Sequence, residues 1–184
     1  GDVPGSEIPQ RYFDWLRRRD GRLMADVFEH NRLDILSLAA LAAHLAELVD
    51  PAGETARCHP GDRLAAARLF LARECPDDAV RLLDPLVGCA SAETARDAAR
   101  ELSLHYRRQG QWPAAVAIWE EMLRRDEADL FALVELAKWC EHRRRDFAQA
   151  LALTERAGAG RLSPDERAAF ARRRERLERK LAEQ

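Results

Sequence analysis

Two side chains in the first third of the sequence, His30 and Asp34, have a spacing that allows joint chemistry. They are four residues apart, so on a helix they lie on one face, one turn from each other. That face continues as a row of leucines, where an ionised carboxylate is costly unless it is paired or bound to a metal. A local pair with His30 at a domain edge would satisfy Asp34. The functional alternative is that Asp34 binds a metal while His30 orients or deprotonates a water molecule.

The cysteines do not predict a zinc site. Four are present, spaced 17, 14 and 51 residues apart, with no C-x-x-C pair and no finger-type histidine pair. We interpret Cys58 and His59 as a loop dipeptide, and Cys140 with His142 as a coincidence at a helix end. Reduced, half-buried thiols of this kind are typical of a cytoplasmic protein.

Composition indicates a helical chain. Of the 184 residues, 33 are Ala and 25 are Leu, whereas Val, Ile and Thr number 7, 3 and 3. Because β-branched residues favour strands and Ala and Leu favour helices, we predict an all-α fold. The net charge of −2 gives no global field that attracts nucleic acid. No run of about 18 apolar residues predicts a membrane span, and we expect a cytoplasmic location.

The helix that carries His30 and Asp34 belongs to the first of two predicted parts. Pro4, Gly5 and Pro9 favour an extended start, followed by a short helix that ends before Gly21. A longer helix then spans 23–49, and its leucines on both faces predict packing on both sides. We expect residues 1–50 to be one unit, 51–61 a linker and 62–184 a second unit.

The second part has the pattern of three helical hairpins and a final helix. The predicted helices span 62–73, 77–87, 91–109, 113–125, 129–141 and 147–157, and a last helix begins after the capping sequence at Ser163. With the two helices of the first part, this gives nine. Ala79, Ala115 and Ala150 recur at intervals of 36 and 35, and one extra residue falls within 143–145.

This segment resembles the tetratricopeptide repeat family, in which pairs of antiparallel helices stack into a right-handed solenoid. The clearest unit is 96–129, and Trp112, Trp119, Tyr106 and Phe147 are expected in the core of the solenoid. The resemblance implies a protein-interaction module whose first helices line a concave face. In that register five basic side chains lie on the face: Arg68, Arg100, Arg107, Arg108 and Lys138.

Such a face would suit an acidic peptide, a C-terminal carboxylate or a phosphate backbone, since arginine pairs with these groups in a bidentate fork. Alternatively, acidic neighbours such as Asp97, Glu101 and Glu135 balance the arginines, and the repeats are a scaffold or brace. A third possibility is a helical domain that binds nucleic acid through the basic run of the last helix. Glu175 and Glu178 interrupt that run, which favours a solvated face.

The first 50 residues carry a second resemblance. The segments Asp2-Val-Pro-Gly-Ser-Glu-Ile-Pro, Tyr12-Phe13 and His30-Asn31-Arg32-Leu33-Asp34-Ile35-Leu36-Ser37-Leu38 resemble the C-terminal end of the exonuclease domain of the YprB-type family. Those proteins are related to the DnaQ-like, ribonuclease H-fold 3′-to-5′ exonucleases, and tetratricopeptide repeats commonly follow their nuclease domain. The same order is present here.

This resemblance implies roles for two residues. In the superfamily four acidic residues hold two divalent metals, Mg²⁺ or Mn²⁺, and DNA or RNA is the substrate. Asp34 corresponds to the last acid and His30 to the residue one turn before it, although the H-x-x-x-D spacing mixes two common forms. The other acids have no counterpart. We therefore expect the chain to be the end of a nuclease whose body is absent, with no metal bound and no cleavage by itself.

Overall fold

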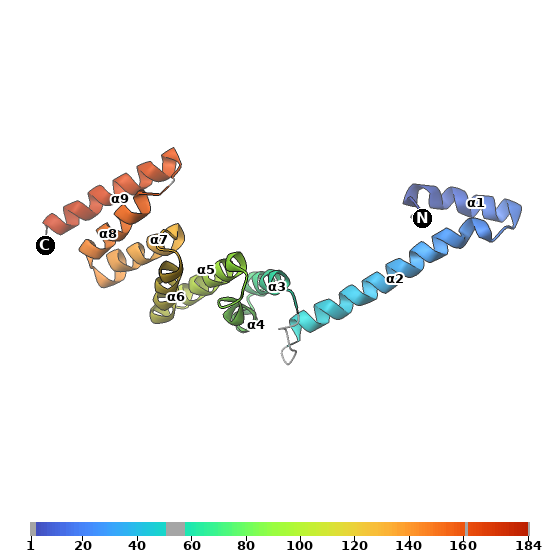
Figure 1. Ribbon diagram of the computed structural model, residues 1–184, viewed down its shortest axis with the longest axis horizontal. Coiled ribbons are helices and arrows are strands. Elements are labelled where there is room, and N and C mark those ends of the chain that lie inside the picture. The colour runs from blue at the N-terminus through green and yellow to red at the C-terminus, as the bar shows by residue number, and fades with distance from the viewer. Residues whose placement is uncertain (1–2, 51–57, 161, 184) are drawn as a thin grey trace. The chain divides into compact units, whose positions relative to one another are not determined.

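The computed structural model describes residues 3–50, 58–160 and 162–183, and within these ranges the chain forms nine α-helices and no strand (Figure 1). The prediction of an all-α fold with nine helices is confirmed. The chain divides into two compact units, residues 1–58 and 59–184. No helix in the described ranges is long and apolar enough to cross a membrane. Most of the predicted linker, residues 51–57, lies outside the described ranges.

The first unit is a pair of helices with a small core. A 3-10 turn at Gly5–Glu7 leads into α1 (Ile8–Arg18), which is followed by α2 (Arg22–Val49). The predicted extended start holds at Pro4 (φ −56°, ψ 129°) but ends at Gly5, and Pro9 instead occupies the first turn of α1, where its missing N–H costs no helical hydrogen bond. The core consists of five side chains: Val3, Met24, Val27, Ile8 and Trp15.

Most of α2 is exposed. Every residue from 31 to 43 is exposed, and Leu38 keeps 65% of its surface accessible. The predicted packing on both sides is therefore wrong for the chain as described. We call seven exposed large apolar side chains between residues 28 and 45 of this helix the α2 apolar surface: Phe28, Leu33, Ile35, Leu36, Leu38, Leu41 and Leu45. A helix that is apolar all round is normally buried, so this surface requires a cover.

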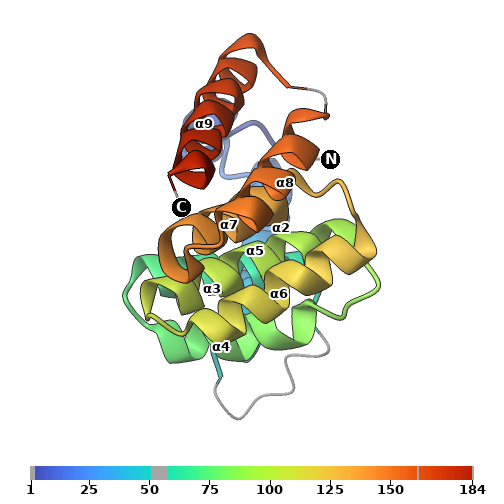
Figure 2. The same ribbon diagram turned by 90° about the vertical axis from the view of Figure 1, so that its left-hand side faces the viewer.

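The second unit consists of three helical hairpins and a final helix (Figures 1 and 2). The hairpins are α3 (Pro60–Ala72) with α4 (Pro76–Leu83), α5 (Ala92–Arg108) with α6 (Trp112–Arg125), and α7 (Leu130–Trp139) with α8 (Phe147–Gly158). The last helix, α9 (Pro164–Ala182), packs against α8 and starts with the predicted capping box at Ser163. Because Pro85 has no N–H, α4 ends four residues early, in a 3-10 turn at Asp84–Leu86.

The turns inside the three hairpins share one backbone geometry. Each contains one residue with positive φ: Glu74 at 59°, Gly110 at 72° and Arg145 at 55°. In sequence these positions recur at 36 and 35 residues, the intervals of the three alanines that predicted the hairpins. A left-handed residue at this point ends a helix by turning the chain back on the preceding carbonyls. The periodicity of the sequence is therefore also a periodicity of the backbone.

The extra residue of the third hairpin is absorbed in a π-helical turn. In the first two turns, the N–H groups of Cys75 and Gln111 bond to carbonyls five residues back. In the third, the N–H of Asp146 reaches the carbonyl of Cys140, six residues back, after the π-helix Cys140–Arg144. A π-turn accommodates one additional residue without breaking the helix.

Trp119 is the largest fully buried side chain of the second unit. It lies at 0% exposure in a core with Leu133, Ala150 and Leu177, to which α6, α7, α8 and α9 all contribute. Tyr106, Trp112 and Phe147, also predicted for this core, pack against it but are only partly buried. A fully buried aromatic residue therefore belongs to a core that four helices share.

We expect Trp119→Ala to lower the free energy of unfolding of the second unit by about 3 to 5 kcal/mol, because it leaves a large cavity among close-packed side chains. Leu69→Ala is the matched control, since Leu69 is 59% exposed and its loss should cost under about 1 kcal/mol. Urea unfolding followed by circular dichroism measures both. Equal effects of the two variants would contradict the assigned core.

Candidate functional site

The predicted pair of His30 and Asp34 is present on α2. The His30 Nε2 atom lies 3.2 Å from the Asp34 Oδ2 atom, and the Asp34 side chain is 60% exposed. The leucine row had predicted that this carboxylate faces a core. Within this unit it does not. It lies on the exposed helix, among the side chains of the α2 apolar surface.

Asp34 is not part of a larger group of metal ligands in the described ranges. The one group of three or more ligating side chains found there does not include it. A centre with two divalent cations needs several carboxylates, since hard cations are bound by many oxygen atoms. His30 and Asp34 do not make such a centre alone, so any remaining ligands would have to come from outside the described residues.

The structure brings together three other ligating side chains, which sequence spacing did not reveal. One ligand atom each from His44, Glu47 and Cys58 lies within 4.8 Å of the other two. His44 and Glu47 are three residues apart on α2, but Cys58 is 14 residues beyond His44. No short motif joins them, which explains why the sequence pattern gave no signal.

Most of the basic residues predicted for the concave face have intramolecular partners. The Arg68 guanidinium on α3 donates hydrogen bonds to Asp97 and Glu101 on α5, both at 2.9 Å. These bonds raise the pKa of Arg68. Arg68 therefore connects the first helices of two successive hairpins.

Glu135 makes the corresponding connection between α5 and α7. The buried Glu135 carboxylate accepts hydrogen bonds from Arg107, at 2.5 Å, and from Lys138, at 2.6 Å. Arg100 lies over the Phe131 ring, 4.8 Å from its centroid. Arg107 and Lys138 are thus neutralised by an acidic neighbour, as expected if the repeats are a scaffold or brace.

Arg108, the last of the five predicted basic residues, influences a buried histidine. Burial and then the positive charge of Arg108 lower the pKa of His105 below its ordinary value. The neutral form of the His105 imidazole is thereby favoured, so that no second positive charge lies beside Arg108.

The densest charge cluster surrounds Glu141, in the π-helical turn after α7. Its side chain is fully buried, and three cations of α9 donate hydrogen bonds to it: Arg173 at 3.1 Å, Arg176 at 3.0 Å and Lys180 at 2.9 Å. Three of the six cations in the basic run that was predicted to be a solvated face (Arg172, Arg173, Arg174, Arg176, Arg179 and Lys180) are therefore paired with a buried carboxylate. We call Glu141 and its three counter-ions the Glu141 cluster.

The Glu141 carboxyl is ionised at neutral pH. Burial alone would raise the pKa of Glu141, but the hydrogen bonds from Arg176 and Lys180 and the charge of Arg173 outweigh it and lower the pKa to about 2. The ordinary value is 4.5. Because the ionised form belongs to the folded state, the cluster stabilises α9 above about pH 4.5, and this contribution is lost as the pH falls towards 2.

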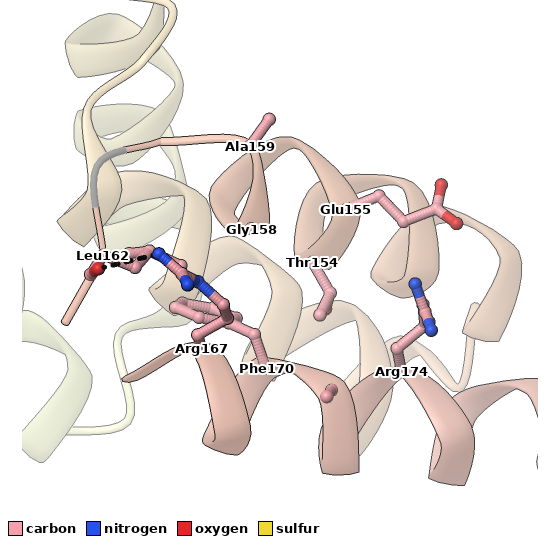
Figure 3. A pocket seen from close by; sticks show the side chains of 9 residues that line it. Thr154, Glu155, Gly158, Ala159, Leu162, Arg167, Phe170 and Arg174 are labelled. Carbon is pink, nitrogen blue, oxygen red and sulfur yellow. Dashed lines mark hydrogen bonds between the residues drawn. The ribbon is translucent and has the colours of Figure 1, made fainter. Parts of the chain in front are cut away.

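A cavity of about 320 Å³ lies between the end of α8 and the start of α9 (Figure 3). Leu162 and Phe170 provide apolar lining, and Arg167 Nη2 donates a 3.4 Å hydrogen bond to the Leu162 carbonyl. Figure 3 shows Glu155 and Arg174 at the opposite end from Arg167. The one hydroxyl among its described lining residues, Thr154 Oγ1, donates a 2.7 Å hydrogen bond to the Ala150 carbonyl and not to the neighbouring Glu155 carboxylate, so it is not paired with a base. The cavity therefore does not have the composition of a hydrolytic site.

Comparison with known proteins relates the chain to ribonuclease H-like proteins. Residues 1–46 match the sequence model of the RNase_H superfamily. The chain is also 32% identical over 158 residues to "Uncharacterized protein YprB" of Bacillus subtilis (strain 168). That alignment covers 85% of this chain and 38% of the relative, so the chain spans well under half of the relative's length. No solved structure gives a significant match.

We expect Glu141→Gln to destabilise the second unit by about 3 kcal/mol at pH 7, because it leaves three cations of α9 without their buried counter-ion. Glu178→Gln is the control, since Glu178 is a half-exposed residue of the same helix. Urea unfolding at pH 7 and pH 3 measures the effect. The wild type should lose more stability between these pH values than Glu141→Gln, and equal losses would contradict the role of the cluster.

Proposed function

We propose that this chain is the C-terminal part of a metal-dependent 3′-to-5′ exonuclease acting on DNA or RNA. In this proposal α1 and α2 are the last helices of a ribonuclease H-like domain, and the hairpins that follow are a tetratricopeptide-like protein-interaction module. The observation that carries it is the position of His30 and Asp34 on the exposed α2, within the segment that matches the RNase_H superfamily.

The α2 apolar surface supports the same assignment. Its seven large side chains are exposed in this chain, although leucine and isoleucine on both sides of a helix favour a fully packed environment. The body of a ribonuclease H-like domain would provide that environment. Covering the helix would also bring Asp34 close to carboxylates that this chain does not supply.

In the complete protein Asp34 would be one ligand of Mg²⁺ or Mn²⁺, which polarise phosphate oxygens when bound. His30 lies within 3.2 Å of it and has a side chain that is one-third exposed. Its imidazole is suited to orient a water molecule or to accept its proton near neutral pH.

We predict that Asp34→Asn removes nearly all nuclease activity from the protein extended upstream to include the whole nuclease domain. His30→Ala should cost less, roughly 100-fold, as expected for loss of a general base or orienting group. Glu29→Gln, an exposed carboxylate on the same helix that pairs with Arg32, should retain activity. The assay is Mn²⁺-dependent release of nucleotides from the 3′ ends of labelled single-stranded DNA and RNA.

Two outcomes would contradict this assignment. Full activity of Asp34→Asn would remove Asp34 from the metal centre. Cleavage by the purified 184-residue chain would show that the activity does not need further carboxylates.

The helical unit carries the second part of the proposal. Its hairpins repeat the same turn geometry at 36 and 35 residues, which is close to the 34-residue period of tetratricopeptide repeats. A cavity of about 370 Å³ between α5 and α6 has an apolar floor of Ala95, Ala99, Ile118 and Met122. An apolar hollow beside charged side chains suits a peptide with one anchoring residue.

A brace for the nuclease domain is the second candidate function. The ion pairs of Arg68, Arg107 and Lys138 favour it, since a basic side chain paired within the fold offers less charge to an acidic ligand. Arg100 and Arg108 have no ion pair among the described contacts. Variants of these two residues therefore distinguish a peptide-binding module from a brace.

We predict that Arg100→Glu combined with Arg108→Glu abolishes binding of acidic peptides and lowers the stability of the second unit by no more than about 1 kcal/mol, the cost of losing the contact of Arg100 with the Phe131 ring. Arg107→Glu is the contrast, because it would place a second carboxylate against the buried Glu135 and lower stability. Fluorescence anisotropy with a labelled polyglutamate peptide measures binding. No binding by the wild type would favour the brace, whereas binding of labelled RNA that weakens steeply between 50 and 200 mM salt would favour a nucleic-acid surface.

A further inference from the structure

We propose that His44, Glu47 and Cys58 form a binding site for a transition-metal ion, with Zn²⁺ as the preferred occupant. The site lies within the first unit, at the C-terminal end of α2. It is independent of the proposed nuclease function and of the hard cations assigned to Asp34.

The geometry of the three side chains is close to that of a metal site. His44 and Glu47 are three positions apart on α2, so they project from the same side of the helix. With the Cys58 Sγ atom, their ligand atoms all lie within 4.8 Å of one another. A tetrahedral zinc ion holds its ligand atoms roughly 3 to 4 Å apart, given bonds of about 2.0 to 2.3 Å. The upper limit of 4.8 Å is within about 1 Å of this spacing, and the Glu47 side chain is exposed and therefore free to adjust.

The donor chemistry selects the class of metal. Imidazole nitrogen, carboxylate oxygen and thiolate sulfur together favour a borderline-soft ion such as Zn²⁺, whereas Mg²⁺ and Ca²⁺ prefer oxygen ligands alone. Three protein ligands leave one tetrahedral position for water. On binding, the Cys58 thiol gives its proton to solvent as the metal–sulfur bond forms, so affinity should rise with pH.

Burial is graded across the three ligands. Cys58 is 5% exposed, His44 is intermediate and Glu47 is exposed. The thiol is therefore held on the inner side, and the carboxylate lies where an ion enters from solvent. This arrangement differs from an exposed thiol that binds metals adventitiously, for which Cys75 provides an example in the same chain.

The site is distinct from the His30 and Asp34 pair. His44 follows His30 by 14 residues on the same helix, which at 1.5 Å per residue is about 21 Å along the axis. One ion cannot be shared over this distance. The proposal also differs from the sequence-based expectation that no zinc site is present and that Cys58 is half of a loop dipeptide.

The test uses Co²⁺ as a spectroscopic substitute for Zn²⁺ in the 184-residue chain under reducing conditions. We expect one Co²⁺ per chain, an absorption band from sulfur-to-cobalt charge transfer, displacement by Zn²⁺ and no displacement by Mg²⁺. Cys58→Ser should remove the band and weaken Co²⁺ binding by more than about 100-fold, since the loss of groups that merely support a ligand costs 10- to 100-fold. Cys75→Ser is the matched control and should keep both.

Glu47→Gln tests the site at an exposed position, where folding is unaffected. It should weaken Co²⁺ binding at least about 10-fold, with an unchanged far-ultraviolet dichroism spectrum, and His44→Gln should do the same. The proposal is overturned if the wild type binds no Co²⁺, if the band persists in Cys58→Ser, or if Glu47→Gln and His44→Gln both bind as the wild type does. In the last case the metal is held by the thiol alone.

Discussion

The buried Glu141 carboxylate imposes the strongest constraint on the helical unit. A charge without access to water is tolerated only when counter-ions and hydrogen bonds replace its hydration. Its counter-ions are 32 to 39 residues further along the chain, on α9, which therefore has to lie against the π-helical turn after α7. Asp129 has a similar role, because its carboxylate caps α7 and accepts a 2.7 Å bond from Arg96 on α5. Ion pairs thus connect successive hairpins at defined positions.

The first unit shows the opposite condition. Only Met24, Val27 and Leu48 are buried on its long helix, and large apolar side chains between them remain exposed over several turns. Such a surface is a common property of an element that belongs to a larger domain. The superfamily match over residues 1–46 agrees with this physical argument, and together they are the main support for the proposed nuclease.

The two chemical groupings on α2 differ in the metals that they favour. The imidazole and carboxylate of His30 and Asp34 form a pair that is incomplete for hard cations. The proposed site at His44, Glu47 and Cys58 contains sulfur and favours a softer ion. The two proposals therefore assign one helix two separate groups of metal ligands, about 21 Å apart.

The sequence by itself determined the helices, the capping box at Ser163, the hairpin intervals and the His30–Asp34 pair. All of these depend on residues a few positions apart or on a repeated pattern, because capping, proline effects and helical periodicity are local. Only the tertiary structure decided that Arg107 is paired, that Glu141 gathers three cations, that the leucines of α2 are uncovered and that Cys58 approaches His44. These features join residues 14 to 39 positions apart, or depend on what packs against a helix, and no local pattern encodes either.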